Sequence, residues 1–114
     1  MAMVEIEEIE HRWVESNRLI SLLVLLEYEY PEIMERIKPT QISTDSVAMM
    51  LLFALDFDSR HWAEKAVTWI ESGFPIDASI CDKLLKISVS KTDSQNLRHR
   101  SLKQASRWKR EIAT

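Results

Sequence analysis

Hydrophobic residues recur at helical spacing along most of the chain. Between residues 4 and 27 they fall on one stripe and then form a continuous run, which predicts one long helix whose second half, Leu19–Leu26, is buried. The run Val47–Leu55 is apolar on every face, as expected for the central helix of a core. No segment alternates polar and apolar residues over the length of a strand beside a hairpin turn. The pattern therefore predicts an all-α fold.

Proline and glycine divide the remaining chain into shorter helices. Pro31 suits the first turn of a helix that extends to Ile37, and Pro39 blocks its continuation. Gly73, the only glycine in 114 residues, follows an amphipathic stretch at residues 59–72. We expect it to end that helix with a positive φ.

Side chains that cap helix N-termini mark the other boundaries. Ser43, Thr44 or Asp45 is expected to begin a helix at residues 45–57, and Asp58 or Ser59 the helix at residues 59–72. Asp77 is expected to cap a helix that ends near residue 88. The run Thr92-Asp93-Ser94-Gln95 resembles a capping box that opens a last helix to about residue 111.

These elements predict a single domain over residues 1–114, a compact bundle or short array of five to six helices. The predicted core combines the two apolar runs with residues from the later helices. Those residues are Trp62, Ala66, Trp69, Ile70, Leu84 and Leu85, closed by Leu102 and Trp108.

The helices from residue 44 onward follow one another with short turns, and some residues recur between them. The recurring pairs are Arg60-His61 with Arg98-His99, Lys65 with Lys103, and, after a one-residue slip, Ala66-x-x-Trp69 with Ala105-x-x-Trp108. In this respect residues 44–112 resemble HEAT-type helical hairpin repeats. The resemblance implies a scaffold that binds partners without catalysis. A generic orthogonal helix bundle accounts for the same residues equally well.

Composition removes several classes of function. One glycine cannot supply a phosphate-cradling loop, a dinucleotide-binding turn or a nucleophile elbow. The single cysteine, Cys81, excludes an internal disulfide and a multi-cysteine zinc site, so we expect a structural thiol and a reducing, cytoplasmic location. No apolar run approaches the roughly 20 residues of a membrane span, and the acidic N-terminus is not that of a signal peptide. We expect no cofactor and no membrane partner.

Charge is divided unequally along the chain. Residues 1–58 carry twelve Asp and Glu against four Lys and Arg, a net charge of −8, whereas residues 59–114 carry six against eleven, a net charge of +5. This division is compatible with an ordinary solvated surface and also with two binding faces of opposite sign.

The last predicted helix concentrates the positive charge. At about 100° per residue, Arg100, Lys103, Arg107 and Arg110 share one arc. The opposite arc consists of Leu97, Leu102, Ala105, Trp108 and Ile112. The basic arc can contact an acidic protein surface or nucleic acid phosphates.

Two groups of residues have spacings that occur in metal or catalytic sites. Glu8-x-x-His11 has the spacing of one half of a di-iron motif, but the second half is missing. Asp58, His61 and Glu64 lie three residues apart, so neighbours among them can share a helix face. We expect no metal at either group, since solvated and capping roles account for both.

The leading hypothesis is a non-catalytic protein–protein interaction module that binds a protein partner or a second copy. In the second case an acidic face composed of Glu5, Glu7, Glu8 and Glu10 would meet the basic arc of another copy. The alternative is a nucleic-acid-binding accessory protein that uses the last helix, although the pI of 5.6 argues against it. An enzyme or metal protein using Asp58, His61 and Glu64 is a third hypothesis.

Overall fold

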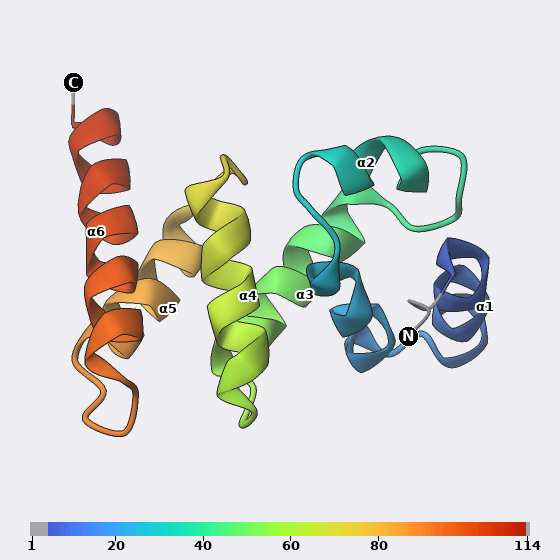
Figure 1. The fold of residues 1–114 in the computed structure, drawn as a ribbon. Helices are drawn as coiled ribbons and strands as arrows, with labels where there is room; N and C mark the ends of the chain where they lie inside the picture. The colour runs from blue at the N-terminus through green and yellow to red at the C-terminus, as the bar shows by residue number, and fades with distance from the viewer. Residues whose placement is uncertain (1–4, 114) are drawn as a thin grey trace.

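The structure is a computed structural model that describes residues 5–113, and every regular element in that part of the chain is helical (Figure 1). The elements are α1 (Ile6–Ser16), the 3₁₀ helix η1 (Leu19–Glu27), α2 (Glu32–Ile37), α3 (Thr44–Asp56), α4 (Arg60–Glu71), α5 (Ala78–Ser88) and α6 (Gln95–Ile112). The all-α prediction is confirmed. Within residues 5–113 no helix combines the length and apolarity that a membrane crossing requires.

Two helical hairpins, α3–α4 and α5–α6, lie side by side, and α6 forms one end of the molecule (Figure 1). η1 packs on α3 and α4, and α1 packs on η1 at the opposite end (Figure 1). The described residues therefore contain two hairpins, one fewer than the three repeats that usually share a continuous core. Here η1 covers the side of the core that a third hairpin would cover.

The core is centred on α3. Its residues Val47, Met50, Leu51, Ala54 and Leu55 are buried, and η1, α4 and α5 all pack against this helix. The predicted core is largely correct, but Ile20 and Met49, in its two apolar runs, are 45% and 57% exposed. Leu102 is 46% exposed and does not close the core. On α6 the buried positions are instead Leu97, Ser101, Gln104 and Ala105. The apolar arc predicted for α6 was therefore centred too far toward Leu102.

The predicted long first helix is wrong because the helix ends at Asn17. Asn17 has a φ of 54° and donates its backbone N–H to the Trp13 carbonyl, 2.8 Å away, which ends α1. Asparagine tolerates this left-handed conformation better than most residues. The Ser16 hydroxyl bonds to the Arg12 carbonyl, and the chain turns through extended Arg18 into η1. One expected helix thus becomes two, so the helix count of five to six was slightly low.

Two of the four predicted N-terminal caps are confirmed, whereas Ser59 takes the N-cap position of α4 without a side-chain hydrogen bond. The Ser43 hydroxyl accepts from the Ser46 N–H at 3.0 Å, and the Asp77 carboxylate accepts from the Ile80 N–H at 2.8 Å. Gly73 has a φ of 111°, as expected for a residue that ends a helix. The predicted capping box is wrong: Ser94 rather than Thr92 caps α6, through the Leu97 N–H.

A buried ion pair fixes the start of α4 to the connection between α5 and α6. Arg60 donates Nε to Asp93 Oδ1 at 2.6 Å and Nη2 to Asp93 Oδ2 at 3.1 Å. It also donates Nη1 to the carbonyls of Leu55 and Phe57. Only 4% of the Asp93 side chain is exposed, so its charge depends on this partner.

Replacing Asp93 by alanine should lower the free energy of unfolding by about 2–3 kcal/mol, because Arg60 would lose its carboxylate in a partly buried position. Asp82→Ala, an exposed change on α5, is the matched control and should stay within about 0.5 kcal/mol of the parent. Urea unfolding curves measure both values. Equal losses for the two variants would contradict a structural role for the pair.

Ser101, on the buried side of α6, lowers the stability of the fold. Its hydroxyl is fully buried and has no hydrogen-bond partner among the described residues. Ser101→Ala should raise stability by about 1 kcal/mol, since it removes an unsatisfied polar group and improves helix propensity. Ser106→Ala, on the same helix, should show only the smaller propensity effect, about 0.5 kcal/mol. A lower urea midpoint for Ser101→Ala than for the parent would show that this hydroxyl contributes to stability.

Candidate functional site

The four predicted cations of α6 divide into two pairs with different roles. Arg100 and Arg107 bind carboxylates of this chain, whereas Lys103 and Arg110 are exposed and have no side-chain partner among residues 5–113. The predicted site is therefore only partly available. The cations free to contact another molecule are Lys103 and Arg110.

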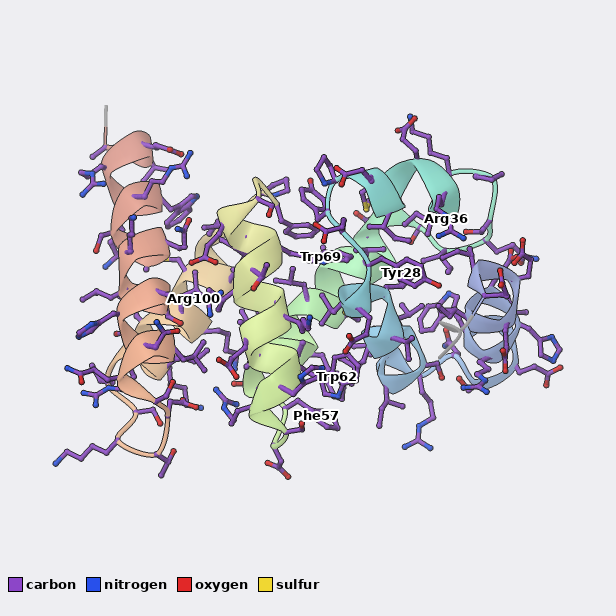
Figure 2. All side chains as sticks on the ribbon, in the orientation of Figure 1. Tyr28, Arg36, Phe57, Trp62, Trp69 and Arg100 are labelled. Carbon is purple, nitrogen blue, oxygen red and sulfur yellow. The ribbon has the colours of Figure 1, made fainter. Side chains whose placement is uncertain are left out.

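Arg100 ties α6 to α4. Its guanidinium donates to both carboxylate oxygens of Glu71, at 3.0 and 2.8 Å, and to the hydroxyl of Thr68 at 3.0 Å. Figure 2 shows Arg100 between the two helices. The hydrogen bond to Glu71 raises the pKa of Arg100, against the opposing effect of burial. Arg100 thus has a structural role, and its charge is compensated within the chain.

The outer side of α6 is a basic face, defined here as Lys103, Arg110 and the exposed Leu102 beside Lys103. α6 carries six Lys and Arg and one Glu, a formal charge of +5. It packs on α5 and α4 only by its inner side, and it forms the end of the molecule (Figure 1). The basic face therefore meets solvent.

The opposite end of the molecule carries the acidic face, the predicted set of Glu5, Glu7, Glu8 and Glu10 on and just before α1. Glu8 pairs with Arg12 at 2.6 Å, and Glu10 accepts the backbone N–H of Gln41 at 2.7 Å. Glu5 and Glu7 are exposed and have no side-chain partner among the described residues. As on α6, half of the predicted charges remain available.

Val14 adds an apolar residue to this acidic face, and sequence reasoning missed it. Glu7, Glu10, His11 and Val14 line a shallow hollow together with Gln41. Val14 is 52% exposed. Its position on the helix could have revealed it. Val14 lies three residues after His11 and four after Glu10, so it shares their side of α1 and not the buried stripe of Ile6 and Ile9. Both charged ends thus carry exposed apolar residues, Val14 on α1 and Leu102 and Ile112 on α6.

A pocket of about 140 Å³ lies beside the basic face, between α6 and the connection from α4 to α5. Phe74, Pro75 and Trp108 contribute apolar walls, and Arg107 and Gln104 contribute polar groups. Sequence reasoning could not find this pocket because its two sides are about 30 residues apart in the chain. Only packing brings them together.

The residues considered for metal or catalytic chemistry do not converge. His61 Nε2 lies 2.6 Å from Glu27 Oε1, so it bridges α4 to η1. Asp58 lines a different, polar pocket that includes Arg60 and Asp93. His11 lies 3.9 Å from Glu15. Among residues 5–113, no group of three His, Cys, Asp or Glu side chains is arranged to hold a metal ion.

Cys81 is buried, and its Sγ lies 3.9 Å from the carbonyl oxygen of Ala105. Burial raises the pKa of the Cys81 thiol, Asp82 raises it further, and Lys109 lowers it. A thiol that remains protonated and enclosed is a poor nucleophile. The predicted burial of Cys81 is confirmed.

No protein-family model, curated protein or solved structure matches this chain. The assignment of a function therefore depends on the geometry and charge of the chain itself.

Proposed function

We propose that this protein is a non-catalytic protein–protein interaction module whose basic face on α6 binds an acidic protein surface. The observation that carries the proposal is that Lys103 and Arg110 have no partner within the described chain, although the other two cations of their arc do. Uncompensated charge beside an exposed leucine, at the end of an array, is the kind of surface that a complementary partner covers.

The acidic partner that this chain supplies itself is the α1 end of a second copy. Residues 5–16 carry five Glu and one Arg, a formal charge of −4 against +5 on α6. Two α6 ends repel each other, as do two α1 ends, so association by these faces joins unlike ends. Such a heterologous contact leaves one free end of each kind and allows chains of copies to grow.

Nucleic acid fits the basic face less well than a protein does. Arg100 is held by Glu71 and Arg107 by Glu111, which leaves two of the four predicted phosphate contacts. The whole chain carries a net charge of −3, which opposes long-range attraction to a polyanion.

Altering the charge of one end at a time tests the proposal. Lys103→Glu/Arg110→Glu removes the basic face, and Glu5→Gln/Glu7→Gln removes the acidic face, so neither double variant should self-associate. The acidic face is neutralised rather than reversed so that the two altered faces do not attract each other. A mixture of the two retains one intact face of each kind and should form a 1:1 heterodimer that grows no further. Sedimentation velocity at about 50 mM salt measures this, and the heterodimer should dissociate as salt rises toward about 500 mM.

Two variants control for the number of charges changed. Lys86→Glu/Lys91→Glu and Glu29→Gln/Glu32→Gln alter exposed residues away from the two faces and should leave self-association intact. A mixture that remains monomeric would contradict self-association. Salt-sensitive binding of mixed-sequence DNA by the parent, lost in Lys103→Glu/Arg110→Glu, would assign the face to nucleic acid instead.

A further inference from the structure

The pocket beside α6 is lined by a side-chain amide that has no partner among the described residues. Gln104 is 6% exposed, and no hydrogen bond engages its side chain within residues 5–113. It lines the pocket that Phe74, Pro75 and Trp108 also line. Its amide atoms reach solvent, since in the described part of the chain only the Ser101 hydroxyl is both fully buried and without a partner. An accessible amide at the wall of the pocket can bond to a polar group of a ligand.

The pocket has the size of one small apolar side chain. A cavity of about 150 Å³ accommodates a benzene molecule, so a volume of about 140 Å³ can hold an isopropyl group. Arg107, which lines the pocket, lies on the same helix as Lys103 and Arg110 and is paired only with exposed Glu111 in the hydrogen bond at 3.2 Å. Glu111 also lines the pocket and offsets Arg107, so the uncompensated positive charge beside the pocket is that of Lys103 and Arg110. These two cations favour an apolar group that is flanked by carboxylates.

The acidic face of α1 presents that combination. Val14 is 52% exposed and shares a shallow hollow with Glu7 and Glu10. Glu10 uses Oε2 to accept the Gln41 N–H, and its other carboxylate oxygen has no partner among the described residues. Val14 and Glu10 are four residues apart on a helix, so they project from one face.

We propose that the pocket between α6 and the α4–α5 connection is the specificity site of the self-association, and that it receives Val14 from α1 of a second copy. This inference depends on the proposed function. The isopropyl group of Val14 fills the space between Trp108, Phe74 and Pro75. The Gln104 amide donates to the free oxygen of Glu10 in the second copy. Charge brings unlike ends together, and the pocket determines which residues meet.

The heterodimer of the two charge variants isolates one junction and allows a double-mutant cycle. Val14→Ala is made in the Lys103→Glu/Arg110→Glu copy, which supplies α1, and Trp108→Ala in the Glu5→Gln/Glu7→Gln copy, which supplies the pocket. Val14→Ala should raise the Kd about tenfold, since it removes two buried carbon atoms. Combined with Trp108→Ala, it should change the Kd less than about twofold, because the wall that Val14 contacts is absent.

Matched controls use other exposed apolar residues. Ile20→Ala replaces a residue that is 45% exposed on the α1-supplying copy, and Leu102→Ala one that is 46% exposed on the other copy. Ile20→Ala should leave the Kd unchanged, and Leu102→Ala should not couple to Val14→Ala.

An NMR measurement tests the pocket without the Trp108→Ala variant and so does not depend on whether that variant folds. In ¹⁵N-labelled copies that supply the pocket, the Gln104 side-chain amide and the Trp108 indole resonances should shift when the α1-supplying copy is added. The shifts should be reduced when that copy carries Val14→Ala.

The outcomes separate the two proposals. A heterodimer whose Kd is insensitive to Val14→Ala, or whose Gln104 and Trp108 resonances do not move, overturns the pocket assignment and leaves the charged faces as the binding surfaces. Absence of any heterodimer between the two charge variants overturns self-association, and the pocket assignment fails with it.

Discussion

The need to cover α3 determines the arrangement of the other helices. α3 is apolar over most of its surface, and it buries Val47, Met50, Leu51, Ala54 and Leu55. η1, α4 and α5 pack around it. The first and last helices are therefore left at the ends of the molecule, each packed by one side only (Figure 1). The two surfaces most available for binding follow from the way the core is enclosed.

Electrostatics within the chain then determines which charges at those ends remain free. Arg60 is bound to Asp93 and Arg100 to Glu71, and both pairs fix the positions of α4 and α6. Charges that take part in such pairs add little to the field outside the molecule. Among the ions that remain are Lys103 and Arg110 at one end and Glu5 and Glu7 at the other, and at physiological salt their attraction extends only about 8 Å. Binding by these faces, as proposed, would act at contact distance and need shape as well as charge, which the pocket at Gln104 and the exposed Val14 would provide.

Sequence reasoning succeeded where the relevant physics is local. The positive φ of Gly73 and the caps at Ser43 and Asp77 depend on one residue and its immediate neighbours. It failed at Asn17, where a left-handed residue outweighs a continuous apolar stripe and divides one expected helix into α1 and η1. It also failed at Leu102, which it placed on the inner side of α6, because packing on α5 and α4 buries Ser101 and Gln104 there instead.

Only part of the candidate site could be predicted, again because the sequence shows local properties but not tertiary contacts. The basic arc of α6 and the acidic start of α1 are visible in the sequence because charge is a property of each residue. Which of those charges is compensated depends on Glu71, Glu111 and Gln41, and only the packed structure shows these contacts. The pocket has no sequence signal, since Phe74 and Gln104 meet only after α5 and α6 have folded against α4.

The proposed self-association requires the two unlike ends of this molecule to bind each other in neighbouring copies. Sedimentation velocity of the unmodified protein, over a range of concentrations at about 50 and about 500 mM salt, tests it most directly. Binding between unlike ends predicts a mean mass that rises continuously with concentration at the lower salt, without a plateau at the mass of the dimer. At the higher salt the mean mass should return to that of the monomer. A monomer at every concentration and salt, or a closed dimer indifferent to salt, would contradict it.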